Sequence, residues 1–100
     1  MRDELLGLPI EAIAAFCRRY GVRELSLFGS ALRDGFRADS DIDLLVEFEP
    51  DAPVGFMTLS RMQRELSTML GRRVDLVPKG GLKAPIRQSV LDSAEVLYAA

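Results

Sequence analysis

Two spacings of apolar residues alternate along the chain and predict its helices and strands. Apolar positions three or four residues apart predict helices over residues 10–20, 56–69 and 84–93. Short apolar runs predict strands over residues 22–28, 41–48 and 73–77. Gly21 and Gly71 follow the first two helices and predict where they end, whereas Pro9 and Pro85 fit first helical turns. In the middle helix the following residues repeat at helical spacing, and the methionines among them are expected to fill the core: Phe56, Leu59, Met62, Leu66 and Met69.

The connecting segments are assigned from their turn residues. Residues 30–34 are expected to form a short helix, 37–40 a polar connection, 49–53 a loop and 79–81 a flexible turn. Residues 94–98 could extend the last helix or form a short edge strand, and the strand is favoured. Together these elements predict one α+β domain over residues 1–100, with a small mixed β-sheet and about four helices.

Composition narrows the functional classes. Apolar residues make up 48% of the 100 residues, which favours a packed domain, and no run is long enough to span a membrane. The N-terminus lacks the apolar stretch of a signal peptide, so we expect a cytoplasmic protein. With no histidine and one cysteine, a His-based catalytic triad is impossible, and Cys17 is expected to be a buried hydrophobic residue.

Charge makes direct nucleic-acid binding unexpected, because the net charge is −2. Local groups of basic residues could still face an acidic ligand or partner, although most surface basic residues only keep a protein in solution. These basic residues are Arg18, Arg19, Arg72, Arg73, Lys79, Lys83 and Arg87.

Two short motifs carry the chemistry. Gly29 and Ser30 directly follow the first predicted strand. Ten residues later, Asp41 and Asp43 flank Ile42 at the start of the second strand. Strand side chains alternate between faces, so both carboxylates are expected on one side and Ile42 in the core. Mg²⁺ uses one or two carboxylates plus substrate phosphates, and a glycine turn before a helix suits phosphate. Either motif alone is common; in this order they predict a metal–nucleotide site.

A third carboxylate, Asp75, lies within the apolar run of residues 73–77. An acidic side chain is costly to bury without a partner. Asp75 therefore either faces solvent on a half-exposed strand or shares a site with Asp41 and Asp43. The pair upstream favours the shared site.

The chain resembles the DNA polymerase β-like nucleotidyltransferases. The resemblance runs from Leu25 to about Val77, and its most specific parts are Leu27-Phe28-Gly29-Ser30 and Ser40-Asp41-Ile42-Asp43-Leu44. The short length is similar to the minimal nucleotidyltransferases, the MNT antitoxins that pair with HEPN-domain ribonuclease toxins. This resemblance implies nucleotidyl transfer from ATP, with Asp41 and Asp43 holding two Mg²⁺ ions. It also implies that Asp75 holds the catalytic ion and helps to deprotonate the acceptor, and that Gly29 and Ser30 grip the triphosphate.

The acceptor is not encoded in an obvious way, because no residues remain for an acceptor-binding domain. The resemblance implies that a HEPN toxin forms a complex with the chain and brings a tyrosine as acceptor, so that added AMP inactivates the toxin. Two alternatives remain open. The chain could neutralise a toxin by binding alone, or it could transfer a nucleotide to RNA or to a small molecule.

Overall fold

The computed structural model describes residues 9–29, 41–52, 54–82 and 84–100. These residues form a four-stranded sheet in the order β3-β2-β1-β4. Strands β1 (Val22–Phe28), β2 (Ile42–Phe48) and β4 (Glu95–Ala99) pair antiparallel through β1. Strand β3 (Val74–Pro78) pairs parallel with β2, so the predicted mixed sheet is confirmed. The strand favoured over residues 94–98 is β4.

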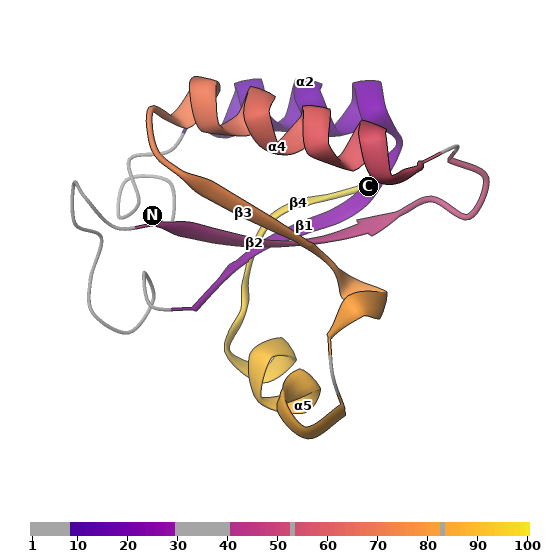
Figure 1. The fold of residues 1–100 in the computed structure, drawn as a ribbon, viewed down its shortest axis with the longest axis vertical. Coiled ribbons are helices and arrows are strands. Elements are labelled where there is room, and N and C mark those ends of the chain that lie inside the picture. The colour runs from indigo at the N-terminus through magenta and orange to yellow at the C-terminus, as the bar shows by residue number, and fades with distance from the viewer. Residues whose placement is uncertain (1–8, 30–40, 53, 83) are drawn as a thin grey trace.

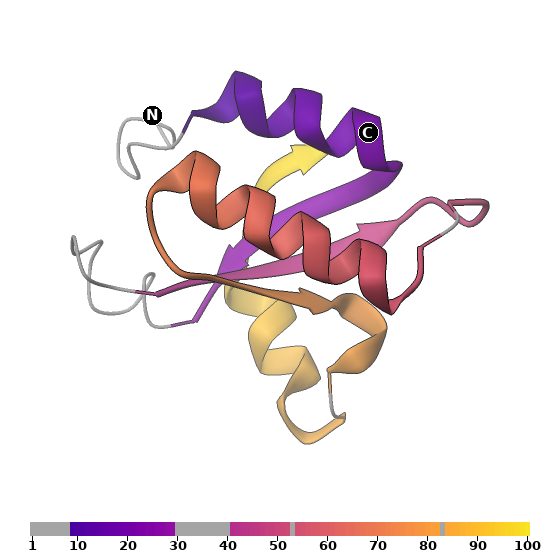
Figure 2. The same ribbon diagram turned by 45° about the horizontal axis from the view of Figure 1, so that its top comes forward.

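Two helices cover one face of this sheet and a third lies on the other side. Helices α2 (Ile10–Tyr20) and α4 (Phe56–Leu70) run side by side above the strands (Figures 1 and 2). Helix α5 (Ala84–Ser93) lies below them and connects the two edge strands, β3 and β4 (Figure 1). None of the helices in the described ranges is long and apolar enough to cross a membrane.

Helix ends follow the glycines, as predicted. Gly21 and Gly71 adopt left-handed conformations with φ of 71° and 66°, and each amide donates back to the last turn of its helix. Glycine has no Cβ to oppose this conformation, so it ends the helix at little cost. Residues 79–81, expected to be a flexible turn, instead form a 3₁₀ helix (Lys79–Gly81). The described part of the chain thus holds three α-helices and this 3₁₀ turn, and the short helix expected over residues 30–34 lies outside it.

The core lies between the sheet and the α2–α4 layer. Phe16, Leu27 and Met62 are among its fully buried side chains, and Cys17 lies there as predicted. Burial raises the pKa of the Cys17 thiol to about 12, so the thiol stays protonated and unreactive. Not every apolar residue of α4 reaches the core: Met62 is fully buried, whereas Phe56, the first residue of the helix, is 83% exposed.

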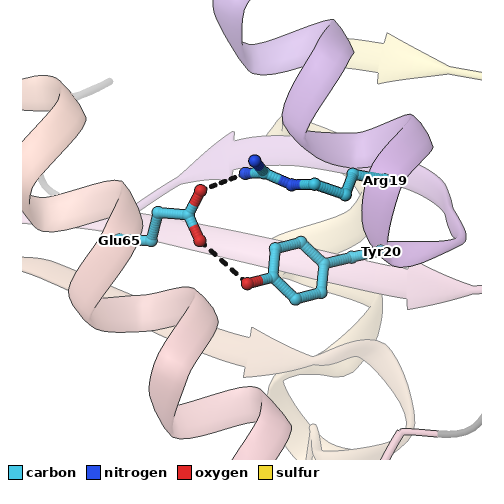
Figure 3. Close-up of polar contacts among 3 residues, drawn as sticks. All are labelled: Arg19, Tyr20 and Glu65. Atoms are coloured by element: carbon cyan, nitrogen blue, oxygen red, sulfur yellow. Dashed lines mark hydrogen bonds and ion pairs between the residues drawn. The ribbon is translucent and has the colours of Figure 1, made fainter.

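A polar contact joins the two covering helices (Figure 3). Glu65 on α4 accepts a hydrogen bond of 2.8 Å from the Tyr20 hydroxyl and forms an ion pair with Arg19. The Arg19 guanidinium also stacks over the Tyr20 ring, 5.3 Å from its centroid. The hydrogen bond to Glu65 is the main cause that raises the pKa of Tyr20 above its usual value. This contact fixes α2 against α4 at the end of β1 remote from Gly29.

Candidate active site

The acidic residues meet where β1 ends and where β2 and β3 begin. Asp43 is the register partner of Phe28 on one side and of Asp75 on the other. The parallel ladder starts one residue earlier, where the Ile42 amide donates a 2.9 Å hydrogen bond to the Arg73 carbonyl. Two neighbouring strands therefore bring Asp43 and Asp75 directly opposite each other.

Burial shows which face of the sheet the carboxylates occupy. Ile42 is fully buried, and Val74 and Leu76 are 2% and 5% exposed in the core. Asp43 is half-buried and Asp75 is exposed, so alternation places both on the opposite face, away from α2 and α4. Asp41 is exposed and comes just before β2, which begins one residue later than the sequence predicted.

Gly29 lies against the carboxylate of Asp43. Its φ is +87°, a conformation that disfavours any side chain. A Cβ built on Gly29 would approach Asp43 Oδ2 to 2.3 Å. The glycine is thus required for two reasons: the backbone turns there, and the Asp43 carboxylate occupies the space of a side chain. The sequence motif suggested the first reason and its phosphate role, but not the contact with Asp43.

The electrostatics of Asp43 are those of a crowded anionic site. Burial raises the pKa of its carboxyl above the ordinary value of 3.8, and the charges of Asp75 and Asp41 raise it further. Both neighbouring carboxylates therefore act on Asp43, and a cation beside it would relieve the repulsion.

The donor set fits a hard cation shared with a ligand. Among the described residues, no three acidic or thiol side chains are close enough together to enclose a metal ion on their own. Mg²⁺ does not need such a cage, because it binds one or two carboxylates and completes its shell with water and substrate phosphates. The facing pair, Asp43 and Asp75, fits that role, with Asp41 adding negative charge.

Comparison with known proteins shows the family to which most of the chain is similar. The family model described as "Nucleotidyltransferase domain" matches residues 10–97. The chain belongs to this family. This nucleotidyltransferase is 44% identical over 80 residues to the protein adenylyltransferase MntA of Thermococcus cleftensis, covering 80% of this chain and 77% of the relative.

Two solved structures share the fold of this nucleotidyltransferase. A crystal structure of a toxin–antitoxin with AMP-PNP superposes with a TM-score of 0.75 at 22% identity, covering 93% of this chain and 75% of the other. A tri-AMPylated HEPN toxin of Shewanella oneidensis in complex with its MNT antitoxin gives a TM-score of 0.67 at 20% identity, covering 91% and 70%. At these identities the likeness concerns the fold.

Two of the basic residues noted in the sequence pair with acidic residues outside the candidate site. Arg19 pairs with Glu65, and Lys79 lies 3.2 Å from Glu47 and 3.9 Å from Glu24, beyond the middle of the sheet. Ser30 lies outside the described residues, as do the side chains of Lys83 and Arg87, so these assignments stay predictions.

Proposed function

We propose that this nucleotidyltransferase is an antitoxin that transfers AMP from ATP to a tyrosine of a HEPN-domain ribonuclease toxin in the cytoplasm, with which it forms a complex. The observation that carries the proposal is the facing of Asp43 and Asp75 across β2 and β3, with Gly29 pressed against Asp43. A family match over residues 10–97 makes nucleotidyl transfer the reaction class.

Each site residue has a distinct task. Mg²⁺ would be held by Asp41, Asp43 and Asp75, and the family resemblance implies two ions. When bound, the ions would neutralise the charge of the phosphates. Gly29 leaves the backbone open to the triphosphate, and Ser30 adds a hydroxyl at the following position. Asp75 is the more exposed of the facing pair, so it is accessible to an incoming hydroxyl and can take its proton.

In the reaction, the acceptor oxygen forms a bond to the α-phosphorus of ATP as the bond to the β-phosphate oxygen breaks. Pyrophosphate leaves, and the proton of the acceptor passes to Asp75. Phosphoryl-group chemistry of this kind needs alignment and charge neutralisation more than covalent participation by the protein. The facing carboxylates of Asp43 and Asp75, with Asp41 nearby in sequence, would supply both.

The relatives favour a protein as the acceptor. The Thermococcus relative is a protein adenylyltransferase, and the Shewanella complex holds a HEPN toxin that carries three AMP groups. On a HEPN ribonuclease, AMP adds bulk and negative charge where RNA must bind. An antitoxin that acts by binding alone would not need these carboxylates. Without a cation, the charges of Asp75 and Asp41 destabilise the ionised Asp43.

The test is adenylyl transfer to defined acceptors. The chain is incubated with Mg²⁺, ATP labelled in the α-phosphate, and either a HEPN-domain ribonuclease, RNA or a metabolite extract. We expect label on a tyrosine of the ribonuclease and none with an Asp43→Asn variant. Label on RNA or on a small molecule would replace the proposed acceptor. A wild-type chain that silences the ribonuclease at equal ratio without labelling anything would establish the binding-only antitoxin.

A further inference from the structure

Asp75 stands on an edge strand, and edge strands have unpaired backbone groups. Within the described ranges, β3 pairs with β2 on one side and with no strand on the other. In a parallel ladder, alternate N–H groups point toward the neighbouring strand, so those of Val74 and Leu76 point outward. Such outward groups normally bind water or are covered by another element.

Two side chains of α4 bind both outward N–H groups. The Leu76 amide donates to Gln63 Oε1 at 2.8 Å, and the Val74 amide donates to Ser67 Oγ at 3.1 Å. The Ser67 hydroxyl in turn donates to the backbone carbonyl oxygen of Gln63 at 2.9 Å. This bond directs the lone pairs of Ser67 Oγ toward β3. Gln63 and Ser67 therefore replace part of a fifth strand. We call these two side chains the edge clamp.

The spacing of the edge clamp matches the strand. Four residues along an α-helix rise about 6 Å, and two residues along a strand rise about 6.6 Å. Gln63 and Ser67, four residues apart, thus meet Leu76 and Val74, two residues apart, without distorting either element. Because both clamp residues are half-buried, their hydrogen bonds are partly shielded from water.

The residue between the two clamped amides is Asp75. Its carboxylate points to the face away from the clamp, opposite Asp43. The position of this carboxylate depends on how β3 slides or tilts against β2. With the clamp, the backbone of β3 is hydrogen-bonded on both sides; without it, the ladder to β2 and the core packing of Val74 and Leu76 would hold the strand.

We infer that Gln63 and Ser67 are positioning residues that hold Asp75 in place opposite Asp43. The inference rests on the proposed function, because it assigns Asp75 a role in nucleotidyl transfer. Catalysis is sensitive to such placement: a mutation far from the reacting atoms that displaces a catalytic group by about 1 Å can lower the rate about 100-fold. A purely structural clamp would affect stability and leave the rate of the folded protein unchanged.

The experiment compares variants that keep or remove the acceptor atom. Gln63→Met has similar length and no carbonyl oxygen, whereas Gln63→Glu keeps an acceptor for the Leu76 amide. Ser67→Ala removes the second acceptor. Thr68→Ala, on the exposed side of the same helix, is the matched control. All are assayed at a temperature well below the Tm of the least stable variant.

The first readout is amide hydrogen exchange, which needs no activity. We expect Gln63→Met to lose protection at Leu76 and Ser67→Ala at Val74, while Gln63→Glu and Thr68→Ala retain it. The second readout is AMP transfer. We expect kcat to fall about 10- to 100-fold in Gln63→Met with KM for ATP little changed, because the nucleotide tail is held at Gly29. Gln63→Glu should keep most of the wild-type kcat.

Three results would overturn the inference. Protection at Leu76 could be unchanged in Gln63→Met, or it could be lost while kcat stays at the wild-type value. Gln63→Glu could also be as slow as Gln63→Met, which would show that the acceptor atom is not what matters. Failure of the proposed function looks different: the wild-type chain itself would transfer no AMP, and the positioning role would fall with it.

Discussion

Replacing Gly29 by alanine tests the contact that defines the site. The new Cβ would lie 2.3 Å from Asp43 Oδ2 and 3.1 Å from its Cγ, so the carboxylate must move. Separately, the φ of +87° is one that residues with a side chain rarely adopt. Gly29→Ala therefore carries two penalties, one from the backbone and one from the displaced carboxylate.

The backbone penalty can be measured on its own elsewhere in the chain. Gly71 has a φ of +66°, and a Cβ there would meet nothing within 4 Å. Left-handed backbone costs a residue with a side chain about 1–2 kcal/mol. At about 4–8 °C per kcal/mol for a domain of this size, we expect Gly71→Ala to lower Tm by roughly 5–15 °C. Gly29→Ala should lower it at least as much.

Function should separate the two variants. We expect Gly71→Ala to bind ATP with Mg²⁺ and to transfer AMP like the wild type, because a Cβ at Gly71 would meet nothing within 4 Å and would leave the Asp43 carboxylate in place. Gly29→Ala should lose both, since Asp43 can no longer stand opposite Asp75. Calorimetric titration and the labelled-transfer assay measure this. An active Gly29→Ala enzyme with unchanged ATP affinity would refute the close contact between Gly29 and Asp43.

Three further outcomes follow from the same contacts. Since the folded-state pKa of Asp43 is raised above 3.8, the folded chain binds that proton more tightly than the unfolded chain, and the ionised group destabilises the fold above the raised pKa. Without Mg²⁺, Asp43→Asn should therefore be more stable than the wild type in urea melts at neutral pH. Its advantage in unfolding free energy should shrink as the pH falls toward about 4. A less stable variant would show that Asp43 is structural. Asp75→Asn should keep ATP affinity while transfer falls about 10²- to 10⁴-fold, and an equally fast variant would remove its role as base. Tyr20→Phe should lose about 0.5–1.5 kcal/mol in urea unfolding through the broken bond to Glu65, and transfer should not change; a slower variant would link this remote contact to the site.

Local signals in the sequence were sufficient for most of the elements. Helix ends at Gly21 and Gly71 were predictable because glycine tolerates the left-handed conformation that ends a helix. The family resemblance contributes to the prediction of a strand over residues 94–98, and β4 confirms that strand. The exposure of Phe56 could not be predicted, because a regular apolar period does not show which turn of a helix lies over the core.

The pairing of the site residues needed the structure. Nothing in the order Asp41, Asp43, Asp75 fixes that β3 lies parallel to β2 with Asp75 opposite Asp43, because register depends on tertiary packing. Gln63 and Ser67 were not predictable at all. Polar residues four apart on a helix usually mark its solvent face, and only the position of β3 gives these two their partners.

The placement of the facing pair also bears on what kind of acceptor can reach the site. Asp43 stands on β2, which has a strand on both sides, whereas Asp75 stands on β3, which has no further strand beyond it among the described residues. An edge strand ordinarily carries a risk of aggregation, because its unpaired N–H and C=O groups can pair with a strand of another chain. Here α4 satisfies the outward amides of β3 from the helix side and leaves the opposite face of Asp75 exposed. An acceptor side chain on a large partner can therefore approach Asp75 from beyond the edge, without first displacing a neighbouring strand. A small catalytic domain that relies on its partner to present the acceptor needs this lateral access.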